Sequence, residues 1–156
     1  MRIIVGADHA GFPLKGQVVE ALRLWGHDVE DVGTHDGEPV DFPDVARSVC
    51  DPVRTGKADR GIMVCGTGIG AAMAANKLPG IRAALCHDVT TARLARLHND
   101  SNVLCMGGRI LGQAVASDIV RTWLSTQFEG GRHQGRVDKI ESLESAGAGI
   151  VKETSK

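Results

Sequence analysis

The sequence predicts a single doubly wound α/β domain, with a five-stranded parallel sheet flanked by helices and a C-terminal loop and helix. Short runs of β-branched residues alternate with longer stretches in which apolar residues recur every three or four positions, as in βαβ units. A length of 156 residues fits one domain that folds without disulfides or metal. We expect this domain to span residues 1–144, and the small, polar residues 145–156 to form a flexible tail.

Five strands are expected at Arg2–Ala7, His27–Val32, Gly61–Cys65, Arg82–Cys86 and Asn102–Met106. Helices are expected between and after them at about 13–26, 42–55, 68–77, 88–97 and 112–126. The last helix is the clearest, because Val115, Ile119 and Trp123 recur at four-residue spacing and indicate one buried face. Beyond residue 128 we expect a Gly-rich basic loop, 129–136, and a short helix over 137–144. Right-handed crossovers between parallel strands make this arrangement Rossmann-like.

The composition excludes several classes of protein. The 18 basic and 19 acidic residues give a formal charge of −1, without the basic excess typical of nucleic-acid binding. With 3 Phe, 2 Trp and no Tyr, few rings can stack on bases. No apolar run approaches the roughly 18 residues of a membrane span, and residues 1–7 are too short a run for a signal peptide. We therefore expect a cytoplasmic protein with no nucleic-acid and no membrane partner.

The cysteines and histidines do not form a metal-binding pattern. The 4 cysteines show no CxxC pair and are expected to be reduced thiols. The 6 histidines are scattered, with neither HExxH nor a finger spacing. The sequence therefore predicts no metal and no cofactor.

Ligands of doubly wound sheets bind where the strands end, so the residues that follow the strands are the candidates for a site. Glycine and polar residues gather there, in the segments GADHAG (6–11), CGTGIG (65–70), CHD (86–88) and MGGR (106–109). Glycines that open a helix let backbone N–H groups approach an anion, either a phosphate or a developing oxyanion. Cys65 precedes such a turn, where a thiolate is stabilised.

Simpler interpretations of these residues stay open. CGTGIG also fits a tight turn beside a buried cysteine, or a dinucleotide fingerprint made of Gly66, Gly68 and Ala71 with Asp88 about twenty residues on. Asp8 fits a helix cap with His9 on the surface, and His98 fits a cap near a helix end. The remaining candidates are basic residues that could hold a phosphate or could simply be solvated, namely Arg109, Arg132 and Arg136.

Taken together, five motifs make the chain similar to type-B ribose-5-phosphate isomerases, a family that also contains galactose-6-phosphate isomerase subunits. They are GADHAG, CGTGIG, HND, NVLCMGGR and GGRHQGR, in that order, and the resemblance runs from Arg2 to about Leu143. It implies a metal-free aldose–ketose isomerisation of D-ribose 5-phosphate and D-ribulose 5-phosphate through a cis-enediolate.

The resemblance also implies a role for each candidate residue. Cys65 is the base that moves a proton between carbons 1 and 2, assisted by Thr67, while His98 opens the furanose ring with the help of Asp8. The substrate is bound by the amides of Gly66, Gly68, Ile69 and Gly70, by Asn99, and at its phosphate by His9, Arg132 and Arg136. Arg109 is contributed by a neighbouring subunit, which implies a homodimer, or a dimer of dimers, with the active site at the subunit interface.

The motifs leave more than one sugar open as the substrate. The family loop often reads GGRHQRR, whereas Gly135 here removes one positive charge beside the expected phosphate site. Alternatives are a tetrose phosphate, a hexose 6-phosphate such as allose or galactose 6-phosphate, or an unphosphorylated aldose. A dinucleotide-binding module is the more distant alternative.

Overall fold

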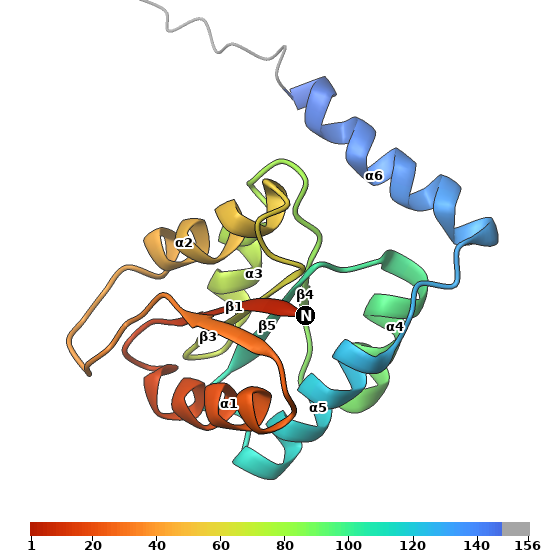
Figure 1. The fold of residues 1–156 in the computed structure, drawn as a ribbon. Coiled ribbons are helices and arrows are strands. Elements are labelled where there is room, and N and C mark those ends of the chain that lie inside the picture. Colours follow the sequence, from red (N-terminus) through yellow and green to blue (C-terminus); the bar gives the residue numbers. More distant parts are fainter. Residues whose placement is uncertain (148–156) are drawn as a thin grey trace, which may run out of the picture.

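A single parallel sheet with the strand order β2-β1-β3-β5-β4 forms the centre of the computed structural model (Figure 1). The structure describes residues 1–147, with side chains as far as Ser145. The strands are β1 (Arg2–Ala7), β2 (Asp28–Asp31), β3 (Arg60–Cys65), β4 (Ala83–Leu85) and β5 (Val103–Gly107). The helices are α1 (Phe12–Leu24), α2 (Phe42–Arg54), α3 (Ile69–Ala75), α4 (Val89–Asn99), α5 (Gln113–Ser125), the 3₁₀ turn η1 (Gly131–His133) and α6 (Gln134–Gly147). The predicted fold class is confirmed.

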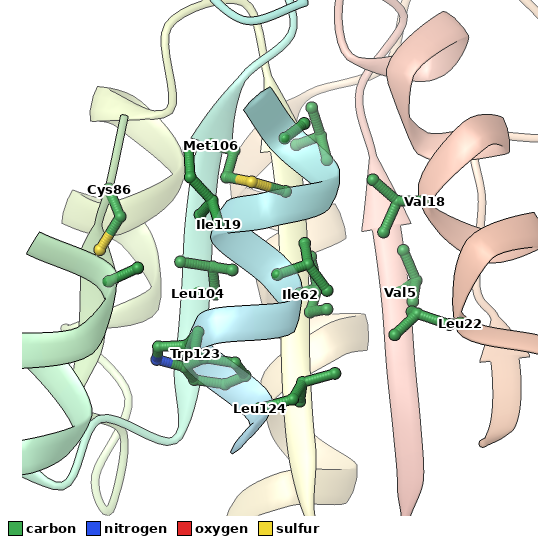
Figure 2. Close-up of a cluster of buried hydrophobic side chains, with 14 of the residues drawn as sticks. Val5, Val18, Leu22, Ile62, Cys86, Leu104, Met106, Ile119, Trp123 and Leu124 are labelled. Carbon is green, nitrogen blue, oxygen red and sulfur yellow. The ribbon is translucent and has the colours of Figure 1, made fainter. Parts of the chain in front are cut away.

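Helices cover both faces of the sheet. Helices α1, α4 and α5 share one apolar cluster with the strands, and α2 and α3 share the other. Figure 2 shows the first cluster, in which Trp123 of α5 lies among Ile62, Leu104 and Leu124. Trp123 is fully buried, and its Nε1–H donates to Ser101 Oγ over 2.8 Å, which ties α5 to the turn that enters β5.

A buried ion pair holds the segment after β2 beside the end of β1. Lys15 of α1 is 1% exposed, and its Nζ donates to Asp31 at 2.7 Å and to the Thr34 carbonyl at 2.6 Å. Ala7 exchanges backbone hydrogen bonds of 2.7 Å with Gly33 and Thr34. The end of β1, directly before Asp8, is therefore fixed from two sides.

The prediction of a loop over 129–136 was wrong for most of its length. The 3₁₀ turn η1 occupies Gly131–His133, and α6 begins at Gln134, three residues before the predicted helix start. The reversal needs only Gly130 and Gly131, whose φ angles are 66° and 55°, a region that few other residues adopt. Val137, 3% exposed, anchors the next turn. Helix α6 continues to Gly147, and the rest of the expected tail, 148–156, lies outside the described residues.

Within residues 1–147, no helix is long and apolar enough to span a membrane.

Candidate active site

The ends of β1, β3 and β5 meet at one edge of the sheet. Ala7 is paired with Val64, and Cys65 with Gly107, so Asp8, Cys65 and the residues after Gly107 lie together. The backbones approach closely because Gly11 has no side chain: a Cβ there would lie 2.2 Å from the Val64 carbonyl oxygen. This edge gathers the candidates from three of the predicted motifs.

Cys65 ends β3 with its side chain directed at the turn that follows. The residue is 4% exposed, and the Gly68 amide donates to its Sγ over 3.1 Å. Gly68 has a φ of 78° and is the N-cap of α3, whose first N–H groups have no partner within the helix. The Cys65 sulfur is thus held at the start of α3, within hydrogen-bond distance of a backbone donor.

The other three thiols have environments that favour the protonated form. Burial raises the pKa of Cys50 to about 12 and that of Cys86 to about 11. Burial also raises the pKa of Cys105, with smaller contributions from the neighbouring thiols. None of these three is suited to be a base near neutral pH, which leaves Cys65 as the candidate.

Two backbone amides of the turn after Cys65 donate hydrogen bonds to side chains of the same turn. Thr67 is exposed, and its Oγ1 accepts the Ile69 amide at 3.3 Å. A Cβ on Gly70 would lie 2.8 Å from the ring of Phe42, so glycine is required beneath that ring. The amides of Gly68 and Ile69 already contact atoms of the turn, and the anion hole from Gly66 to Gly70 stays a prediction.

Asp8 and His9 follow β1 at the same edge. Asp8 is 7% exposed, and its Oδ1 accepts the Gly11 amide at 2.9 Å. Its carboxylate therefore stabilises the turn into α1, but the expected helix cap was wrong, because Gly11 and not Asp8 is the N-cap of that helix. His9 is exposed at this edge.

Arg109 lies beside the Cys65 turn of its own chain. Its amide donates to the Gly66 carbonyl over 3.0 Å, and its Nη1 is 3.6 Å from the position that a Cβ on Gly66 would take. Within one chain Arg109 therefore belongs with Cys65. Its contribution to a neighbouring subunit's site stays a prediction.

The remaining candidates lie at the opposite edge of the sheet. His98 and Asn99 are the last residues of α4, and the chain then enters β5 at Val103. At its other end, β5 places Gly107 beside Cys65. The edge with His98 and the edge with Cys65 are therefore separated by the length of a five-residue strand, which is about 13 Å. The Glu129 amide donates to the Leu97 carbonyl over 3.0 Å, which brings the segment with Arg132 and Arg136 to this edge.

His98 is stacked on a second histidine that the sequence interpretation left aside. The ring centroids of His98 and His133 are 4.2 Å apart, with 12° between the planes. His133 is 4% exposed, and its Nε2 lies 3.2 Å from Glu129 Oε2. Desolvation, then the neighbouring His98 and Arg132, lower the pKa of His133, so this ring is neutral at pH 7. In the sequence, only its position directly after Gly130–Arg132 could have indicated that His133 belongs to the site.

These three side chains are also the candidates for a metal site. The ligand atoms of His98, Glu129 and His133 lie within 4.8 Å of one another. A metal binds an imidazole nitrogen in the plane of the ring, however, and two nearly parallel rings share no nearby point in both planes. The stacked arrangement fits contact between the rings better than joint coordination.

Known proteins resemble the chain over most of its length. The family model described as Ribose/Galactose Isomerase matches residues 3–140. Ribose-5-phosphate isomerase B of Escherichia coli is 47% identical over 143 residues, 92% of this chain and 96% of the relative. A solved structure of ribose-5-phosphate isomerase B from Clostridium thermocellum has a TM-score of 0.92 and 49% identity, covering 94% of this chain and 99% of that one.

A third relative carries the name of a different sugar. D-erythrulose-4-phosphate isomerase of Pectobacterium atrosepticum is 41% identical over 141 residues, 90% of this chain and 93% of the relative. The match to the family model and the matches to these relatives cover the part of the chain in which the five motifs occur. The chain belongs to the ribose/galactose isomerase family.

Proposed function

We propose that the chain interconverts D-ribose 5-phosphate and D-ribulose 5-phosphate through a cis-enediolate, with Cys65 as the base. The broader statement, that the chain is an aldose–ketose isomerase of sugar phosphates, follows from its family and its relatives. The observation that carries the finer proposal is the Cys65 sulfur, held 3.1 Å from the Gly68 amide at the strand ends while the other thiols stay protonated.

Proton transfer needs a base near carbon and donors where negative charge develops. In the open-chain aldose, the Cys65 thiolate takes the proton from carbon 2, and the electron pair moves through carbon 1 to oxygen 1. The amides from Gly66 to Gly70 stabilise the enediolate, and Thr67, exposed beside them, exchanges protons with its oxygens. Return of the proton from Cys65 to carbon 1 gives the ketose.

The other half of the site opens the ring and holds the phosphate. His98 exchanges the proton of the ring oxygen, and Asn99 binds nearby hydroxyl groups. Arg132 and Arg136, both exposed, hold the phosphate with His9. Because the phosphate is remote from carbons 1 and 2, its binding energy serves to orient the sugar.

The position of these two halves supports a site shared between two copies of the chain. Within one chain, Cys65 and His98 lie at opposite edges of the sheet. Large apolar side chains are exposed near the Cys65 edge, including Ile69, Met73 at 65% and Ile110. Exposed apolar side chains also occur on α6, with Leu143 at 69%. Such surfaces are typical of subunit interfaces, so we propose a homodimer, or a dimer of dimers.

A panel of sugars tests the substrate. Ribose 5-phosphate, erythrose 4-phosphate, allose 6-phosphate, galactose 6-phosphate and free ribose are compared by kcat/KM, with ketose formation followed directly. We expect ribose 5-phosphate to rank first and Cys65→Ala to abolish turnover of every sugar in a folded protein. Highest activity on erythrose 4-phosphate would favour the tetrose alternative, which the Pectobacterium relative suggests. EDTA is expected to leave the rate unchanged.

A further inference from the structure

We propose that Glu129 and His133 are positioning residues for His98. The His133 ring stacks on the His98 ring, and the Glu129 carboxylate lies beside both rings. The inference rests on the proposed function, because it assigns His98 the opening of the sugar ring. It adds two residues that the family motifs do not assign by role, and it gives the Gly-rich turn before α6 a purpose besides binding phosphate.

The first support is the position of the Glu129 carboxylate beside both histidine rings. Glu129 is fixed by its own backbone, since its amide donates to the Leu97 carbonyl, one residue before His98. From there Oε2 lies 3.2 Å from His133 Nε2 and 4.0 Å from His98 Nε2. Glu129 Oε2 therefore lies near the Nε2 atom of each ring.

The second support is the protonation of His133. Its lowered pKa makes it neutral, so a single N–H is available. The other ring nitrogen accepts, and Arg132 Nε donates to His133 Nε2 over 3.4 Å. The Glu129 carboxylate lies 3.2 Å from the same nitrogen, so Nε2 of His133 is held between a guanidinium and a carboxylate.

The third support is the contrast in exposure between the rings. His133 is 4% exposed and is carried by a turn that Gly130 and Gly131 form with positive φ angles. The His98 side chain is 35% exposed, so a substrate can reach it. At 4.0 Å, the Glu129 oxygen is beyond hydrogen-bond distance of His98 Nε2, so that nitrogen stays available to a substrate. The buried ring fixes the orientation of the accessible ring.

Ring opening is the step in which this orientation matters. As the bond from carbon 1 to the ring oxygen breaks, its electron pair goes to that oxygen, which takes a proton from His98. The hydroxyl on carbon 1 gives its proton to a solvent water molecule and becomes the aldehyde oxygen. The ring is an isomer of the open chain, and nothing is oxidised or reduced. A sugar that cannot form a furanose skips this step altogether.

The test compares a cyclic sugar with open-chain sugars. Ribose 5-phosphate forms a furanose, whereas 4-deoxyribose 5-phosphate and erythrose 4-phosphate cannot, because the hydroxyl that closes the ring is absent or phosphorylated. Glu129→Gln removes the charge, and His133→Phe keeps a stacked ring without its nitrogens. We expect each variant to lower kcat/KM for ribose 5-phosphate about tenfold or more, and for the open-chain sugars less than about twofold.

Controls separate the inference from the function on which it rests. Asp138→Asn makes the same kind of change on an exposed turn of α6 and should alter neither sugar class. His98→Asn should show the same preference as Glu129→Gln, but more strongly. Equal losses on both sugar classes in the Glu129 and His133 variants would overturn positioning. A wild type inactive on ribose 5-phosphate would overturn the proposed function itself.

Discussion

The Gly68 amide donates a hydrogen bond to the Cys65 sulfur over 3.1 Å, and Gly68 does so with a left-handed backbone whose φ is 78°. A Cβ at this position would lie 2.5 Å from Leu85 Cδ1 and 2.8 Å from the Met106 carbonyl carbon. The hydrogen bond to the Cys65 sulfur and the packing of three strand ends therefore depend on one glycine.

Gly68→Ala is expected to lower both stability and activity. Backbone strain alone costs about 1–3 kcal/mol of the free energy of unfolding, and movement of the turn lowers kcat/KM about a hundredfold as the amide leaves the sulfur. Urea unfolding and the sugar assay measure the two effects. Gly16→Ala is the matched control, because a Cβ there meets nothing within 4 Å in the middle of α1. That variant should gain about 0.5–1 kcal/mol and stay active; a Gly68→Ala protein equal to it would contradict the role of Gly68.

The buried thiols predict a loss of stability at high pH. The pKa values of Cys50 and Cys86 are raised from the ordinary 9.0 to about 12 and about 11, so the unfolded chain loses these protons first. Their contribution to stability is complete below pH 9 and decreases as the pH rises from 9 towards 12.

Urea unfolding at several pH values measures this decrease. Cys50→Ala and Cys86→Ala each lower stability by a roughly constant amount through the cavity they leave, but they should also flatten the decline above pH 9. A decline of unchanged slope in the double variant would assign the pH dependence to other groups.

The strands were predictable because each is a short run bounded by glycine or polar residues, and β1, β3 and β5 are buried almost throughout. All of their boundaries lie within one residue of the prediction. The segment 129–136 was not predictable in the same way, because its glycines suggested a loop. Gly130 and Gly131 make the reversal, and the buried Val137 then holds a helix that includes Gly135. Here a tertiary contact outweighed local composition.

The candidate site was predictable as a set of residues but only in part as a geometry. Cys65 and Asp8 follow adjacent strands, so the topology alone brings them together. The same parallel topology separates His98 from Cys65, because the helix that precedes β5 ends at the amino end of that strand. His133 is recognisable only in three dimensions, because stacking on His98 joins residues 35 positions apart.

Arg136→Ala is expected to lower kcat/KM for phosphorylated sugars but not for unphosphorylated ones. A lost hydrogen bond to a charged group costs about 1.5–3 kcal/mol, which corresponds to about ten- to a hundredfold in kcat/KM for ribose 5-phosphate. Activity on free ribose should be unchanged. Arg136 is a cleaner choice than Arg132, whose Nε lies 3.4 Å from His133. Arg47→Ala, also an exposed arginine, is the control for charge; equal losses on both sugars at position 136 would argue against phosphate binding.

Mixing two inactive variants tests whether the site is shared between copies. Cys65 and His98 lie at opposite edges of one sheet, so Cys65→Ala and His98→Asn damage different halves of each site. In a dimer that combines them, one site carries both changes and the other carries none. Each mixed dimer keeps one intact site of two, so purified mixed dimers should regain about half of wild-type activity.

The measurement co-expresses the two variants with different tags and assays the dimers that retain both. A mixture of Cys65→Ala with Cys65→Ser is the matched control, and it should stay inactive because neither copy can supply the base. If the mixed Cys65 and His98 dimers were equally inactive, both residues would have to serve the same site from one chain. The distance between the two sheet edges would then have to be closed by a movement of α4, since β5 holds Gly107 in register with Cys65.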